Sequence, residues 1–222
     1  MAIEFVQAGV SAVTATSTRT VTLNGVTAGN LIVAVVFWEG PTTTVSVSDG
    51  TSSFTVGNAG VNPDTIDGVW DIRQCVAYLL SANSGNKTYT LTLGAARQTV
   101  ALHVLEFSGD HDWSLDGQAS YGYGRGTTET SGSLTTTGTN VVCVGWGRMW
   151  TSGGYSSQTI GGSTATEATD NGSYSGYTAY RIATLSSGTA VATSTNQYWL
   201  SGLVAFNSDG GGGNPHYYYA QQ

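Results

Sequence analysis

The chain has very little charge. Only 9% of its 222 residues are Asp, Glu, Lys or Arg, against about 25% in an average soluble domain. The positive charges are Lys87 and six scattered arginines, and the net charge is -7. Binding to nucleic acid needs clustered Lys and Arg that pair with phosphates. The sequence therefore predicts no nucleic-acid partner.

Long apolar runs are also lacking. No stretch approaches the roughly 20 apolar residues of a membrane helix, so we expect no membrane partner. The start MAIEFVQAGV has neither the basic beginning nor the apolar run of a signal peptide. We therefore expect the chain to be synthesised in a cytoplasm and to reach the outside of the cell by lysis.

Cysteine and histidine are scarce. Cys75 and Cys143 both lie in alternating apolar runs, which favours buried thiols that act as small hydrophobes. A disulfide stays open only if those strands face each other. Of the three histidines, His103 lies in a strand run and His216 near the chain end. The segment 172–176 places Tyr174 where a nucleophile elbow needs serine, so no catalytic triad is expected.

Paired carboxylates are missing as well. Hydrolysis of a glycosidic bond needs two carboxyl groups that flank the bond. Only Glu106 sits clearly within a strand run, between Leu105 and Phe107, and one carboxylate does not make a pair. The sequence therefore predicts that the protein is not an enzyme and has no cofactor.

One loop is a candidate for calcium. The string SGDHDWSLDG carries Asp110, Asp112 and Asp116, but it lacks the ligand pattern of the helical calcium motif. Aspartate is also a common turn former. We expect no metal site, and a structural Ca²⁺ at these three residues is the alternative.

What the sequence does contain is alternation of apolar and polar residues with a period of two. Turn dipeptides separate the runs, notably Asn24-Gly25 and Asp49-Gly50. Many short strands with turns at this spacing indicate a sandwich or barrel. We expect an all-β protein with a single antiparallel, jelly-roll-like β-sandwich. The runs span 19–24, 30–38, 42–48, 52–57, 73–80, 87–93, 97–107, 132–137, 140–150, 177–183, 189–194 and 197–206.

The pattern contains an internal echo. TAGNLIVAVVFW begins at Thr27, and TGTNVVCVGWG begins at Thr137. Each is a turn ending in Asn, followed by a buried strand that reaches Trp. We infer two related halves, roughly 1–109 and 110–208, of about four strands each, that share one core because neither alone buries enough surface. The alternative is that β patterning by itself produces the echo.

The C-terminal segment differs from the rest. The run NSDGGGG is a flexible linker, and NPHYYYAQQ follows it. We expect a sandwich domain at 1–208 and a Gly linker with a Tyr-rich anchoring tail at 209–222. Tyrosine buries a large area at modest entropy cost, so the tail is expected to dock on a neighbouring subunit, and a disordered tail is the alternative. The residues proposed for docking are Pro215, His216, Tyr217, Tyr218 and Tyr219.

Aromatic residues in expected loops are the candidate binding groups. The segment YGYGRG carries Tyr121, Tyr123 and Arg125, and Trp150 and Tyr155 flank a Ser-Gly turn. Flat rings near Arg and Asn suit stacking on saccharides and suit protein contacts equally well. The alternative is that some of these rings cap the ends of the sandwich.

A family resemblance rests on several segments: MAIEFVQAGVSAVTA, VTAGNLIVAVVFW, VSVSDGTSSFTVG, VALHVLEFSG and WLSGLVAFN. They resemble the β-sandwich, jelly-roll-like module of bacteriophage virion structural proteins and bacterial surface proteins, over residues 1–208. The resemblance implies a structural or adhesive role. The expected protein is then a capsid decoration, fibre or tail-associated subunit, located in the virion after assembly in the host cytoplasm and extracellular after release.

The partners that this resemblance implies are other copies of the chain, other virion proteins and a host-surface glycan. Two alternatives remain open: a stand-alone carbohydrate-binding module, and a subunit of an extracellular filament or surface layer.

Overall fold

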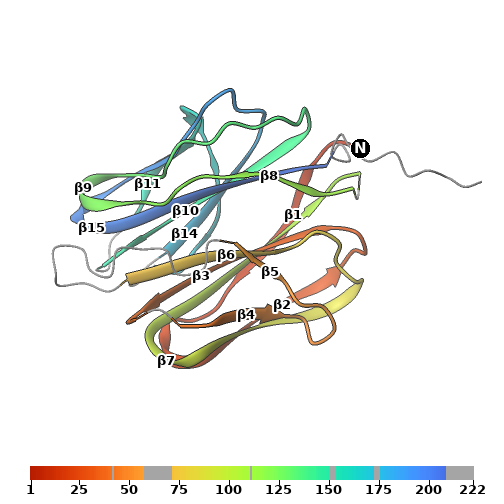
Figure 1. Cartoon of the computed structure of the whole chain (residues 1–222), viewed down its shortest axis with the longest axis horizontal. Helices are drawn as coiled ribbons and strands as arrows, with labels where there is room; N and C mark the ends of the chain where they lie inside the picture. The colour runs from red at the N-terminus through yellow and green to blue at the C-terminus, as the bar shows by residue number, and fades with distance from the viewer. Residues whose placement is uncertain (42, 58–71, 111, 151–153, 173–175, 209–222) are drawn as a thin grey trace, which may run out of the picture.

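The computed structural model describes residues 1–41, 43–57, 72–110, 112–150, 154–172 and 176–208, and these ranges contain strands and no helix. The strands form antiparallel sheets in two packed layers (Figure 1). The prediction of an all-β sandwich is confirmed. In the described part of the chain, no helix has the length and apolar character that crossing a membrane requires.

The first half of the chain forms one layer. Its sheet has the order β1-β7-β3-β6-β5, and β2 and β4 also pair with β7. The strands are β1 (Glu4–Val10), β2 (Thr14–Val26), β3 (Leu31–Glu39), β4 (Val45–Ser48), β5 (Thr55–Gly57), β6 (Ile72–Leu79) and β7 (Gly85–Ser108).

The second half forms the other layer, drawn in green to blue in Figure 1. Its sheet has the order β12-β11-β15-β10-β14-β13, and β8 and β9 also pair with β15. The strands are β8 (Ser114–Gln118), β9 (Gly122–Thr130), β10 (Val141–Met149), β11 (Ser156–Ile160), β12 (Ser163–Thr164), β13 (Thr166–Asp170), β14 (Gly176–Ile182) and β15 (Ala190–Asn207).

The two halves share one strand order. The series β1-β7-β3-β6-β5 corresponds to β8-β15-β10-β14-β13, and the pairs of β2 and β4 with β7 correspond to those of β9 and β11 with β15. This agrees with two related halves. The expected four strands per half is wrong, because each half supplies a sheet of its own with seven or eight strands. The short edge strands were missed, since they carry little apolar alternation.

Long bent strands explain how each half closes on itself. The runs 87–93 and 97–107 are one strand, β7, whose first part pairs with β2 and β4 and whose last part pairs with β1 and β3. The strand is irregular at Thr99, where φ is +46°. The runs 189–194 and 197–206 are likewise joined in β15. The architecture thus depends on the length and bending of β7 and β15, and the alternation of apolar and polar residues predicts neither property.

Two turn predictions had different outcomes. Asp49-Gly50 makes a tight hairpin, because Ser48 and Ser53 pair across it. The hairpin predicted at Asn24-Gly25 is wrong: these residues lie inside β2, where the register shifts and Gly25 has a φ of +66°. Glycine at positive φ serves a β-bulge as well as it serves a turn. The run 132–137 is no strand either and contributes a single bridge at Leu134.

The apolar interior has three parts. One lies in the first half, one in the second, and the third is shared between the layers. The predicted common core exists, and each half adds a core of its own. The largest fully buried members of the shared core are Phe37, Phe107, Trp146 and Phe206.

Buried hydrogen bonds cross the shared core. Trp146 Nε1 donates to Gln74 Oε1 over 2.9 Å, and Gln74 Nε2 donates to the Ser201 carbonyl over 3.1 Å. His103 of β7 lies 2.6 Å from Thr169 Oγ1 of the second half. Burial lowers the pKa of His103 to about 3. Because these polar groups need specific partners, they fix how the two layers align.

Both cysteines are buried free thiols, as predicted. Cys75 belongs to the core of the first half and Cys143 to that of the second, so the shared core lies between them. Burial raises the pKa of each thiol to about 12, and reactivity needs the thiolate. We expect no reaction with a thiol reagent at pH 8 in the native protein and two equivalents after denaturation. Fast labelling of either native thiol would contradict this packing.

Candidate functional site

The side chains that the sequence analysis considered as acids or bases are buried in the fold, where they are described. Glu106 is fully buried and accepts hydrogen bonds from Gln7 Nε2 at 2.6 Å, Thr27 N at 3.1 Å and Asn30 Nδ2 at 2.7 Å. It therefore ties β1 and the turn before β3 to β7. His103 is fully buried between the layers. Tyr174, His111 and His216 lie outside the described residues.

The calcium candidates do not converge. Asp116 accepts hydrogen bonds from Thr137 N at 2.9 Å, Thr137 Oγ1 at 2.5 Å and Gly138 N at 3.1 Å. Asp110 pairs with the amino group of Met1, and Asp112 is exposed. No set of three or more His, Cys, Asp or Glu placed to hold a metal occurs among the described residues. Asp116 lies in β8 and ties the segment at Thr137 and Gly138 to that strand, so it forms neither a turn of its own loop nor a site with the other two aspartates.

The segment YGYGRG is not a loop. It leads into β9, which pairs along β15. Gly124 lets the strand lie close to Trp199, because a Cβ there would sit 3.0 Å from the indole ring. Gly124 therefore lets this face of β9 lie against Trp199, while Tyr123 and Arg125 alternate with it on the other face. The pattern was misinterpreted because glycine is usually depleted in strands.

The structure separates the two tyrosines of this segment. Tyr121 is half-buried and packs its ring edge against Trp146 with centroids 6.3 Å apart. Burial raises the pKa of Tyr121, so this residue belongs to the end of the shared core. Tyr123, two residues further on the same face, is 52% exposed.

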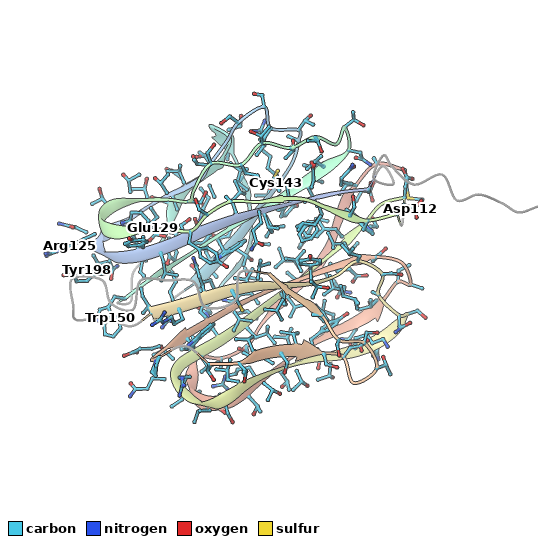
Figure 2. The ribbon with its side chains drawn as sticks, in the orientation of Figure 1. Asp112, Arg125, Glu129, Cys143, Trp150 and Tyr198 are labelled. Carbon is cyan, nitrogen blue, oxygen red and sulfur yellow. The ribbon has the colours of Figure 1, made fainter. Side chains whose placement is uncertain are left out.

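An aromatic strip forms where β9 meets β15. Arg125 and Tyr198 are opposite in register, and the guanidinium carbon of Arg125 lies 5.4 Å from the Tyr198 ring centroid. Trp150 joins them, since its backbone N–H donates to the Tyr198 carbonyl over 3.0 Å. Figure 2 shows Arg125, Tyr198 and Trp150 at one end of the molecule. We call Tyr123, Arg125, Trp150 and Tyr198 the aromatic strip; Tyr198 was missed because it lies in a run that indicated a buried strand.

Tyr155 lies apart from the strip. It is half-buried, packs on Tyr177 of β14 with ring centroids 4.4 Å apart, and has a pKa raised by burial. The ring contributes to the interior of the second half. Of the proposed contact residues, the structure thus brings together Tyr123, Arg125 and Trp150.

Glu129 is a residue that sequence reasoning did not single out. Its side chain is fully buried, and no donor among the described residues meets either carboxylate oxygen in hydrogen-bond geometry. Gly147 makes room for it, because a Cβ at that position would lie 2.4 Å from Oε2. Burial raises the pKa of Glu129 to about 8, and the Ser194 side chain, which lies near the carboxylate without meeting it in hydrogen-bond geometry, acts in the opposite direction. The signal in the sequence, a lone Glu in a Thr-rich strand, is indistinguishable from a surface residue.

A second surface covers the outside of the first half. Strands β2, β7 and β4 pair Thr with Thr or Ser, as in Thr20 with Thr90 and Ser48 with Thr90. The residues between them, such as Val21 and Leu91, point into the core. We call this surface the hydroxyl face; it consists of Thr18, Thr20, Thr22, Ser46, Ser48, Thr88, Thr90 and Thr92.

The proposed anchoring tail, with Pro215, His216 and Tyr217 to Tyr219, lies outside the described residues. The division at residue 208 therefore stays a prediction. No family model matches the chain. No curated protein matches it either.

Proposed function

We propose that this protein is a non-enzymatic virion structural protein of a bacteriophage, a capsid decoration, fibre or tail-associated subunit. It acts by assembly with copies of itself and with other virion proteins, and it contacts a host-surface glycan. Its expected location is the virion, assembled in the host cytoplasm and extracellular after release. The observation that carries the proposal is the hydroxyl face.

The hydroxyl face suits contact between subunits. Three paired strands present Thr and Ser side chains and no charged group, and Thr18, Thr20, Thr22, Thr88 and Thr92 are exposed. The surfaces of soluble domains usually carry interspersed charges that keep neighbouring copies apart. A face without them packs against a neighbouring copy at no cost in buried charge.

The burial of the polar groups in the interior supports a role without catalysis. Glu106 has its hydrogen bonds satisfied within the fold. His103 and Glu129 are fully buried. A general acid or base must reach its substrate, and these three groups do not.

The proposal predicts an oligomer whose contacts run through the hydroxyl face. We expect the full chain to show a defined oligomer by light scattering and the T20K/T90K variant to shift toward the monomer mass, because two cations would be buried without partners. The T184K variant, with one lysine at an exposed threonine of the second half, is the control and is expected to assemble normally. A chain ending at Ser208 tests the tail as a clasp in the same experiment.

A full chain that stays monomeric over a wide concentration range would contradict self-assembly and would favour the stand-alone carbohydrate-binding module. Open-ended polymers would favour the filament or surface-layer subunit instead.

A further inference from the structure

The arginines of this chain are used in two ways. Arg19, Arg97, Arg148 and Arg181 each donate hydrogen bonds to oxygen atoms of the protein. Arg125 is different: its contact within the described residues is with the Tyr198 ring, and its guanidinium donates to none of them. The exposed guanidinium of Arg125 therefore carries five donors that no acceptor in the described part of the chain takes up.

The local structure orients this cation. Arg125 and Tyr198 are opposite in register on β9 and β15, and a guanidinium over a phenol ring gains a cation–π attraction. Gly124 and Gly126 flank Arg125, and the backbone at Gly124 lies against Trp199. The exposed Arg125 side chain thus stands on a strand that lies against the sheet, with its guanidinium over the Tyr198 ring.

A flat ring stands beside the cation. Tyr123 is on the same face of β9, two residues away, which places it about 7 Å along the strand. Its ring is 52% exposed. The surface therefore offers a stacking ring and an unpaired guanidinium side by side.

From this arrangement we propose that the aromatic strip binds an acidic saccharide, with a uronic or sialic acid carboxylate on Arg125 and a sugar ring stacked on Tyr123. This inference rests on the glycan contact proposed above and names its ligand class. Arginine matches a carboxylate with two parallel N–H···O bonds. A protein with a net charge of -7 repels anions in general, so the carboxylate must be bound locally by this one group.

The surroundings favour a sugar over a protein partner. The centre of a protein interface is a contiguous apolar patch, in which aromatic and Arg anchors are surrounded by further contacts that exclude water. The exposed large aliphatic side chains among the described residues are Met1, Val6, Val10, Leu115 and Ile182. None of them belongs to β9 or β15, so the strip offers rings and a cation without aliphatic anchors.

The test is titration calorimetry of the full chain with 3′-sialyllactose and with a trimer of galacturonic acid, each compared with its neutral counterpart, lactose and a galactose trimer. We expect at least one acid to bind about tenfold more tightly than its counterpart, since a hydrogen bond to a charged group contributes roughly that factor. R125K is expected to lose most of the preference, because lysine lacks the planar fork. Y123A is expected to weaken the acid and neutral ligands alike.

The matched control is R97K, which changes an arginine whose donors go to Pro41 and Ala96, and it is expected to leave binding unchanged. Equal binding of acid and neutral sugars, no binding of either acid, or an unchanged preference in R125K would overturn the proposal. Competition by poly-glutamate as effective as by the acids would overturn it in favour of a protein ligand. Light scattering on R125K separates the two proposals, because the oligomer should persist when sugar binding is lost.

Discussion

Replacing Trp146 by alanine is expected to lower the free energy of unfolding by about 4 kcal/mol, as large-to-small changes of buried aromatic residues do. Trp146 is fully buried in the core that the two layers share. Gly202 makes room for its ring, because a Cβ there would lie 2.3 Å from the indole. The ring also supports Tyr121. Denaturant unfolding followed by fluorescence and circular dichroism measures the effect.

The W146F variant separates packing from hydrogen bonding. Phenylalanine fills part of the space, but it leaves Gln74 Oε1 without the donor that now lies 2.9 Å away. A buried acceptor without a partner costs roughly 1–3 kcal/mol, so W146F should fall between the parent and W146A. We expect one cooperative transition in all three proteins, because each half buries part of its surface against the other. A loss below about 1 kcal/mol in W146A would show that the shared core does not hold the layers together.

The second large effect is expected at Glu129. The pKa of Glu129 is about 8 in the folded protein against an ordinary value of 4.5, so the folded state binds more protons than the unfolded state between these values. The contribution of Glu129 to stability is fully present below pH 4.5 and is lost as the pH rises through 8. The E129Q variant keeps the neutral shape and removes the ionisation. Its advantage over the parent should therefore grow with pH, to the order of 4 kcal/mol at pH 9.

The measurement is the free energy of unfolding of both proteins from pH 4 to pH 9. His103 acts in the opposite direction: its folded pKa of about 3 lies below the ordinary value of 6.5, so stability is lost as the pH falls below 6.5. The difference between E129Q and the parent cancels this contribution, because both proteins contain His103.

E106Q is the matched control for E129Q. Glu106 accepts hydrogen bonds from three groups, and an amide would turn an NH2 group toward one of these donors. E106Q should therefore destabilise the protein at pH 9, where E129Q stabilises it. A constant difference between E129Q and the parent across the pH range would show that Glu129 is not a protonated acid in the fold.

Period-two alternation determined the fold class and the echo of two halves. This alternation arises because successive side chains of a strand point to opposite faces, so it can be seen within each strand alone. For the same reason the sequence located the buried thiols: Cys75 and Cys143 continue the apolar alternation of β6 and β10.

The candidate site was only partly visible. The sequence indicated Tyr123, Arg125 and Trp150, since aromatic residues in Gly-rich segments and beside turns are expected to be exposed and available for binding. It did not reveal that the segment is a strand or that Tyr198 lies under Arg125. That contact joins residues 73 positions apart, and pairing across a sheet is decided by register rather than by sequence proximity.

By itself, the sequence thus determined an all-β protein of low charge with an internal echo and two buried thiols, because composition and alternation act residue by residue. Only the tertiary structure decided that each half forms its own sheet. It also decided that Glu106 is satisfied, whereas Glu129 has no donor and Arg125 no acceptor among the residues that the structure describes. The physical reason is that burial and hydrogen bonding of a polar group depend on which distant strands surround it, and long bent strands such as β7 and β15 bring those partners together.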